Sequence, residues 1–309
     1  MSPGPMIHDV LATVLKLLPV VLGIGTGVLL RRTALASAAD GEFLFRLVFA
    51  VCLPALMFTS VSTVRVTPGL ALFLAVPPVM VAAGYTAGRL VGRTSRYSGT
   101  EVPVVVIACM IVNAGFTLPF VQALHGADGV ARVAVFDAVN ASLTFSWAYW
   151  TAARGNPEHR GGGLLLGRLV RSPPLYGIAA GLVVNLAALP VPAAVTEVTG
   201  AFGSATAVLI AIGTGVLLAP VRADLRRAAA VVGARLATGL GVAVTVVLLL
   251  DLRGADRTVL LLLGVAPVAY VTVTFAALEK LDVRLATAVL SLSLATSMAL
   301  AVAVGLVFG

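Results

Sequence analysis

The chain contains few charged residues, cysteines and histidines for its length of 309 residues. Charged residues make up 11% of it, and so apolar a chain is not typical of a soluble domain. The two cysteines, Cys52 and Cys109, fall inside apolar stretches, so we expect buried thiols and no disulfide. The three histidines are dispersed, and there is no HExxH motif, Walker loop or paired-acid motif. We therefore expect no enzyme, no bound metal and no cofactor.

Apolar residues are abundant instead, at 60% of the chain. A helix needs about 20 residues to cross about 30 Å of hydrocarbon. Ten stretches are long enough: 11–30, 42–62, 69–92, 102–124, 129–153, 173–191, 197–219, 228–250, 258–279 and 283–307. Only short loops remain between them. The sequence predicts an all-α polytopic membrane protein with ten transmembrane helices.

The basic residues indicate how these spans are oriented. Sixteen of the 21 lysines and arginines fall on alternate loops, counting Arg46 with the loop after the first span and Arg235 with the loop after the seventh. Positive charge in short loops marks the cytoplasmic side. We therefore expect an integral protein of a bacterial-type cytoplasmic membrane with both termini outside. The net charge is +8, and most of the basic residues are scattered over five short loops. This favours contact with anionic membrane lipids and argues against nucleic-acid binding.

An internal repeat divides the chain into two halves. The pattern P-x3-G-I-x2-G occurs at 19–27 and again at 173–181, an offset of 154 residues. Five spans in each half is an odd number, so the second half enters the membrane from the opposite face. The sequence thus predicts two inverted five-helix repeats, 1–153 and 173–309, joined by a short cytoplasmic linker, 154–172. A second copy, Ile24–Leu30 repeated at Ile212–Leu218, would break this order, and we interpret it as an effect of composition.

Spans four and nine carry interruptions at corresponding places, which is the best sequence indication of a transport site. Pro119 and Pro267 lie 148 residues apart, and Asn113-x-Gly115 precedes the first of them. Each proline alone is compatible with a simple kink, but the pair predicts unwound segments in crossover helices four and nine. The second half of each broken helix then directs the positive end of its dipole at the site, which suits an anion. The predicted substrate-binding residues are Asn113, Gly115, Thr117, Pro119, Ala266, Pro267, Tyr270 and Thr272.

Asp137 is the one acidic residue clearly inside a span, and Asn140 follows on the same helix face. An acid within a transmembrane helix is a functional hypothesis by default. Asp137 is a candidate for binding and releasing a proton during transport, with Asn140 beside it. A structural hydrogen bond between helices is the alternative.

Several short motifs, in this order along nearly the whole chain, resemble the auxin efflux carrier family. They are Gly23-x3-Gly27-x3-Arg31-Arg32, Leu53-Pro54-Ala55-Leu56-Met57-Phe58, Asn113-x-Gly115-x3-Pro119, Ser172-Pro173-Pro174-Leu175 and Ala266-Pro267. The family includes prokaryotic malonate-type and other organic-acid permeases and resembles the bile acid/sodium symporter fold. The resemblance implies elevator-type alternating access, homodimers, and a crossover lined by Asn113, Pro119 and Pro267. The long central loop of the plant carriers is absent here. Sodium-coupled relatives of this fold have acidic and amide ligands around the crossover, where span nine offers only Tyr270, Thr272 and Thr274, and this does not favour sodium coupling.

Together these features predict a secondary active transporter for a small organic anion such as a carboxylate. Proton coupling, sodium coupling and uniport stay open, as does the choice between import and export. A membrane ligand sensor or regulator with the same fold is the alternative, although no soluble output domain accompanies the spans. A channel or a membrane-embedded enzyme has less support in the sequence.

Overall fold

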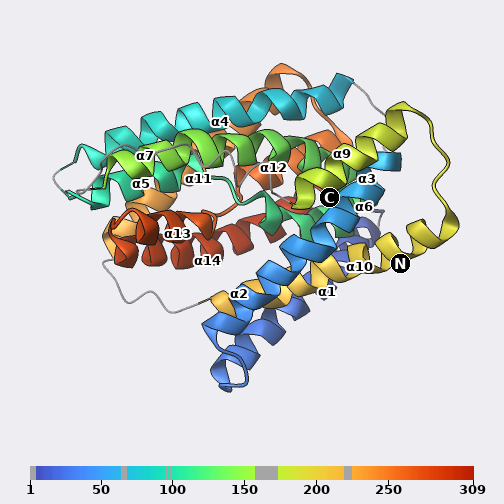
Figure 1. The fold of residues 1–309 in the computed structure, drawn as a ribbon, viewed down its shortest axis with the longest axis horizontal. Helices are drawn as coiled ribbons and strands as arrows, with labels where there is room; N and C mark the ends of the chain where they lie inside the picture. The colour runs from blue at the N-terminus through green and yellow to red at the C-terminus, as the bar shows by residue number, and fades with distance from the viewer. Residues whose placement is uncertain (1–4, 64–67, 95, 98, 157–172, 219–224) are drawn as a thin grey trace.

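The computed structural model describes all residues except 1–4, 64–67, 95, 98, 157–172 and 219–224 (Figure 1). Every regular element in the described residues is helical. Six helical stretches there are long and apolar enough to cross a membrane: Ala38–Thr63, Gly69–Gly92, Glu101–Arg154, Ala193–Leu217, Leu225–Leu249 and Val283–Phe308. The prediction of an all-α membrane protein is confirmed. Most of the predicted linker, 154–172, lies outside the described residues.

The helices of the first half follow one another through short connections. They are α1 (Pro5–Arg32), α2 (Ala38–Leu47), the π-helical turn η1 (Val48–Cys52), α3 (Leu53–Thr63), α4 (Pro68–Gly92), α5 (Glu101–Met110), α6 (Ala114–Leu143), a second π-helical turn η2 (Thr144–Ala148) and α7 (Tyr149–Arg154). A capping box begins α2, because Ser37 Oγ accepts a hydrogen bond from the backbone N–H of Asp40 while the Asp40 carboxylate accepts one from the Ser37 N–H. Within α6, Gly126 has φ 57° and ψ −144°, values that glycine adopts easily, and the helix bends there.

The regular elements in the described residues of the second half are also helical. They are α9 (Pro173–Leu186), α10 (Ala193–Leu217), α11 (Leu225–Leu249), α12 (Gly254–Gly264), α13 (Val271–Leu278) and α14 (Val283–Phe308). Among the basic residues that we counted with cytoplasmic loops, Arg46 lies in α2, which continues into η1 and α3, and Arg235 lies well inside α11. Both fall within apolar stretches, so assigning them to loops from charge alone was wrong.

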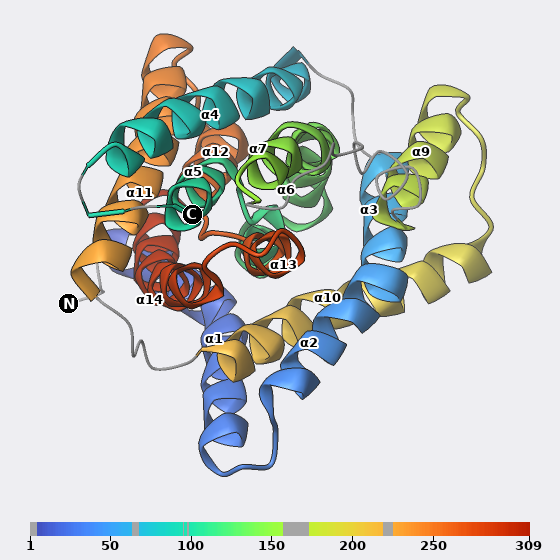
Figure 2. The ribbon, with the colours of Figure 1, turned by 60° about the vertical axis from the view of Figure 1, so that its left-hand side comes forward.

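The described helices pack into two bundles (Figure 2). In the first bundle, α1 packs against α10 and α3 packs against α9, while α2 also contacts α10. In the second, α4 packs against α5, α6 and α11, and α12 contacts α6, α11 and α14. Helix α6 contacts α1, α3 and α10, and thereby joins the two bundles. Each bundle combines helices from both halves of the chain.

The contact between α1 and α10 brings together the two identical segments Ile24–Leu30 and Ile212–Leu218. A Cβ added to Gly27 would lie 2.8 Å from the Cα of Gly215, and a Cβ added to Gly215 would lie 2.9 Å from the Cα of Gly27. Glycines at such positions let helix backbones approach closely in a membrane. The repeated segment therefore has a packing role, and composition alone does not account for it.

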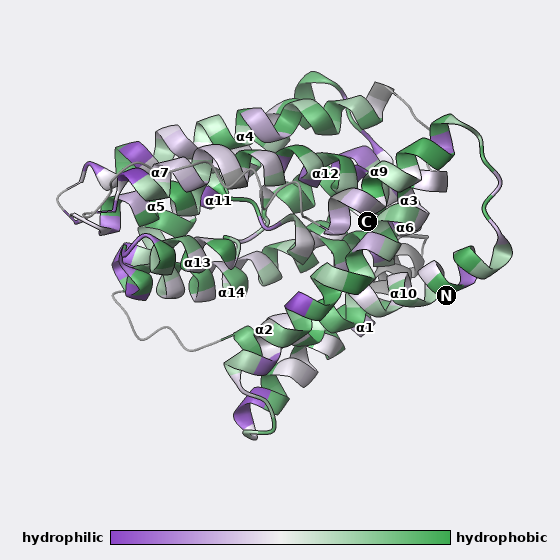
Figure 3. Cartoon of the chain, viewed as in Figure 1, coloured by the Kyte–Doolittle hydropathy of each residue, from purple (hydrophilic) through white to green (hydrophobic). Residues whose placement is uncertain are grey.

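Many hydrophilic residues lie at helix ends and in loops, and the helices between them are mostly hydrophobic (Figure 3). Many large apolar side chains are exposed. Leu22 on α1, Leu186 on α9 and Phe202 on α10 are examples of exposed apolar side chains. Cys52 and Cys109 are buried and free, as expected from their apolar context. The molecule is thus built to face hydrocarbon.

A candidate substrate site at two broken helices

Two helices are interrupted at the centre of the second bundle, and the interruptions touch. Residues 111–113 separate α5 from α6, and residues 265–270 separate α12 from α13. The backbone N–H of Asn113 donates to the carbonyl of Pro267, with 3.1 Å between nitrogen and oxygen. The segments that sequence reasoning placed in corresponding positions of the two halves therefore lie in direct contact.

Side chains from neighbouring helices satisfy the unwound backbone. Asn140 Nδ2 on α6 donates to the carbonyl of Val112 at 3.1 Å. The backbone N–H of Val268 donates to Ser293 Oγ on α14 at 3.2 Å. Such pairing is what permits non-helical backbone at membrane depth. The breaks are consequently held in place by the surrounding helices.

Asn113 has two structural roles in addition to facing the cavity described below. Its Oδ1 accepts a hydrogen bond from the N–H of Phe116 at 3.2 Å, which caps the N-terminus of α6. Its backbone N–H holds Pro267. The Nδ2 group forms no hydrogen bond to any described residue, so the amide can still donate to a ligand.

A cavity of about 800 Å³ opens at the crossing, between the two bundles. Its wall on the side of the first bundle comes from α2, η1, α3 and α10, including Arg46. The other wall comes from the break before α6, from the C-terminal part of α6, and from Ala269, Tyr270 and Val271 at the start of α13. Most lining side chains are apolar, with a few polar groups among them, as is typical of small-molecule sites.

The polarity of the cavity favours a negatively charged ligand. Ala114 and Gly115 at the N-terminus of α6 line the cavity, as does Val271 at the N-terminus of α13. Helix N-termini carry partial positive charge and unsatisfied N–H groups. Arg46 adds a full positive charge and takes part in none of the ion pairs found among the described residues.

Sequence reasoning missed Arg46 as a site residue because it was counted with the loops. The signal was nevertheless present, since residue 46 lies inside the predicted span 42–62. A charged residue within a span is a functional hypothesis by default.

Asp137 and Asn140 lie together on α6, as their spacing predicted, and both line the cavity. Asn140 Nδ2 donates to Asp137 Oδ1 at 2.9 Å and, as noted, to the break before α6. Asp137 is the one acidic residue in the described cavity wall. Its structural hydrogen bond and a role in proton transfer are compatible, because one oxygen pairs with Asn140 while the residue still faces the cavity.

The remaining predicted site residues are placed differently. Of the predicted substrate-binding set, Asn113, Gly115 and Tyr270 line the cavity, and Thr274 on α13 lines it too. Thr117 and Pro119 are buried within α6, where Thr117 Oγ1 donates to the carbonyl of Ala114 at 2.7 Å. Ala266, Pro267 and Thr272 are buried at or just after the second break and are not among the cavity-lining residues.

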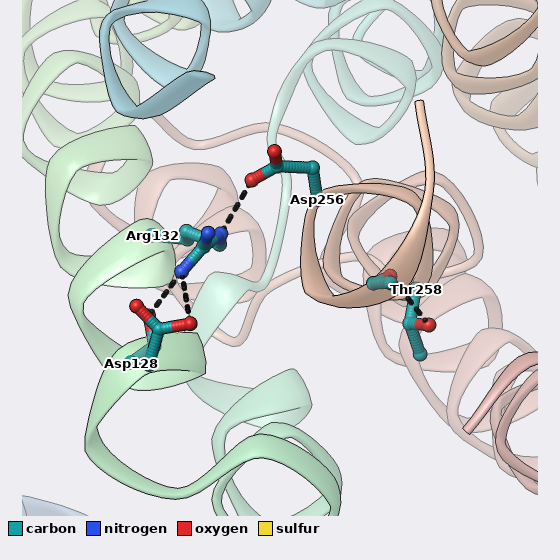
Figure 4. A network of polar contacts seen from close by, with 5 residues as sticks. Asp128, Arg132, Asp256 and Thr258 are labelled. Atoms are coloured by element: carbon teal, nitrogen blue, oxygen red, sulfur yellow. Dashed lines mark hydrogen bonds and ion pairs between the residues drawn. The ribbon is translucent and has the colours of Figure 1, made fainter. Parts of the chain in front are cut away.

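A polar network fastens the two crossing helices to each other beyond the cavity (Figure 4). Arg132 on α6 donates through Nε to Asp256 on α12 at 2.5 Å, and its Nη1 lies 2.7 Å from a carboxylate oxygen of Asp128. Nearby, Thr258 Oγ1 donates to the carbonyl of Phe308 at 2.5 Å. These contacts connect α6 to α12 and α12 to α14.

Comparisons with known proteins show similarity to transport proteins. A family model described as "Membrane transport protein" matches residues 12–162. A protein of Methanothermobacter thermautotrophicus described as "Uncharacterized transporter" is 26% identical over 287 residues, which cover 91% of this chain and 92% of that protein. Both descriptions are of transport, and neither names a substrate.

Proposed function

We propose that the chain belongs to the membrane transport protein family, whose model matches residues 12–162, and that it is a secondary active transporter for a small organic anion such as a carboxylate. In this proposal it lies in the cytoplasmic membrane with both termini outside. Its ten spans form two inverted five-helix repeats, and the anion binds where the two broken helices meet.

The observation that carries the proposal is the charge pattern of the cavity. Two helix N-termini, the free Nδ2 donor of Asn113 and the guanidinium of Arg46 line it. Partial positive charge, a neutral donor and a full positive charge are suited to a carboxylate. A volume of about 800 Å³ is within the usual range of small-molecule sites, which is about 300–1,000 Å³.

The two bundles support an elevator-type movement. The cavity lies between them, with Arg46 contributed by the first bundle and Asn113 by the second. We infer that the second bundle, braced by the Arg132–Asp256 ion pair, moves against the first and carries the crossover with it. The bound anion would then face each side of the membrane in turn.

Asp137 supplies a candidate route for energy coupling. It lines the cavity, as do the ionisable residues Arg46 and Tyr270. A proton taken up by this carboxylate would travel with the anion. The alternative is that the membrane potential alone drives the anion, with Asp137 only holding Asn140.

Transport into proteoliposomes tests the proposal. Purified protein would be reconstituted and exposed to a panel of malonate, succinate, malate, lactate and indole-3-acetate, with and without a pH gradient. We expect a saturable current or uptake for at least one of these anions, and a KM at least tenfold higher in Arg46→Gln. Arg32→Gln is the matched control, because Arg32 lies exposed at the end of α1, away from the cavity. Ligand-induced thermal stabilisation without any flux would contradict transport and favour a sensor.

A further inference from the structure

Arg235 is a buried arginine inside α11 that forms no ion pair with the residues that the structure describes. It is 2% exposed, and its Nε and Nη2 atoms have no hydrogen-bond partner among the described residues. A charged group at membrane depth is costly and is usually paired or functional. The positive charge of Arg235 must therefore be balanced by groups other than a carboxylate among the described residues.

The ends of two interrupted half-helices lie near Arg235. A Cβ added to Gly239, one helical turn later, would overlap both Arg235 Nη1 and the carbonyl oxygen of Gly264. Gly264 is the last residue of α12, so the guanidinium lies beside the C-terminus of that half-helix. On the preceding turn of α11, the carbonyl of Val231 accepts a long contact, 3.8 Å, from the thiol of Cys109. Cys109 belongs to the last turn of α5, so the other interrupted half-helix ends in the same region.

The charge at these two helix ends is negative. The last carbonyls of a helix lack intrahelical partners, and the helix dipole places about half a negative charge there. In transporters with broken helices, such C-terminal ends and unwound carbonyls coordinate the coupling cation. In this protein the guanidinium of Arg235 lies near these helix ends.

We propose that Arg235 is a built-in counter-charge that occupies the place of a coupling metal cation at the crossover, so that turnover needs no sodium. This inference rests on the proposed transport function. Arg235 is a positioning residue in it: the guanidinium neutralises the ends of α5 and α12 and keeps the breaks in register, while the anion binds at the opposite, N-terminal ends of α6 and α13. The substrate anion thus balances the positive N-terminal ends of α6 and α13. The guanidinium of Arg235 balances the negative C-terminal ends of α5 and α12.

Removal of the side chain should convert this place into a cation-binding site. Thermal unfolding of purified protein would be followed in choline chloride, in sodium chloride and in millimolar guanidinium chloride. We expect the wild type to unfold at the same temperature in all three. We expect Arg235→Ala to unfold at a lower temperature in choline and to regain about 2–4 °C with sodium or guanidinium, because a ligand that binds only the folded state stabilises it. Arg226→Ala, at the exposed start of α11, is the control and should show no such ion dependence.

Transport provides the second readout. Wild-type uptake should be equal in sodium and in choline, and Arg235→Lys should keep that independence. Arg235→Ala should transport at least tenfold more slowly in choline and recover in part with guanidinium. A wild type that requires sodium would overturn the proposal, as would an Arg235→Lys variant that acquires such a requirement. A folded Arg235→Ala protein that ignores both cations and transports normally would also overturn it. If the wild type moves none of the tested anions, the transport proposal fails, and the unfolding temperatures still decide the role of Arg235.

Discussion

Asn113 combines a structural and a recognition role that substitution can separate. Its Oδ1 caps α6 through the N–H of Phe116, while its Nδ2 faces the cavity. Asn113→Ala removes both. Loss of an N-cap costs about 0.5–2 kcal/mol, which corresponds to a fall of about 2–4 °C in the unfolding temperature for each kcal/mol. Loss of a hydrogen bond to a charged group costs about 1.5–3 kcal/mol, so we expect kcat/KM to fall roughly 10- to 100-fold.

Asn113→Asp separates these two effects. The carboxylate still accepts from the Phe116 N–H and interacts favourably with the helix dipole, so the unfolding temperature should stay near that of the wild type. It cannot donate to the substrate, however, and it places a negative charge beside an anion. We therefore expect a stable protein whose saturable uptake is lost.

The assay is paired measurement of thermal unfolding and initial uptake rates for wild type, Asn113→Ala and Asn113→Asp in proteoliposomes of the same composition. Normal uptake by Asn113→Asp would refute the assignment of Nδ2 as an anion donor. An unchanged unfolding temperature in Asn113→Ala would refute the capping role.

Three further predictions concern separate parts of the molecule. Asp137→Asn retains an acceptor for the amide of its neighbour but cannot carry a proton, so substrate exchange should persist while uptake driven by a pH gradient disappears; continued gradient-driven uptake would exclude Asp137 from coupling. Arg46→Gln should raise KM at least tenfold, because a charge-assisted contact becomes a neutral one, and an unchanged KM measured across substrate concentrations would contradict that contact. Gly27→Ala forces apart the backbones of α1 and α10 and should destabilise the protein by about 1–3 kcal/mol. Gly25→Ala, where an added Cβ meets nothing within 4 Å, should leave the unfolding temperature unchanged or raised.

Much of the architecture could be predicted from the sequence because lipid imposes a simple rule on length and polarity. The apolar stretches correspond to helices in the described residues, and the interruption of the ninth span was located at Pro267, where the helix does break. The interruption of the fourth span was located less accurately. The non-helical segment ends at Asn113, whose side chain caps the N-terminus of α6, and α6 continues through Pro119. The proline therefore marks the neighbourhood of the break but not the break itself.

The candidate site was harder to predict because it depends on which side chains meet in space. Counting charge to find the cytoplasmic face treated every arginine as a loop residue, and this concealed both Arg46 and Arg235. Their difference is tertiary: one faces a cavity and the other is enclosed by neighbouring helices. Thr117 and Thr272 lie close to the breaks in sequence but point into packed protein. Helical phase and packing, which spacing alone does not give, decide these cases.

The glycine contact between α1 and α10 has the symmetry of a two-fold interface. Gly27 meets Gly215 and the carbonyl of Ile212, while Gly215 meets Gly27 and the carbonyl of Ile24. Because the two segments have the same seven residues, each surface is complementary to a copy of itself. That is the defining property of an isologous contact, which normally joins two identical subunits. Within this single chain, the contact between α1 and α10 is therefore built like the interface of a symmetric dimer, with both partners supplied by one polypeptide.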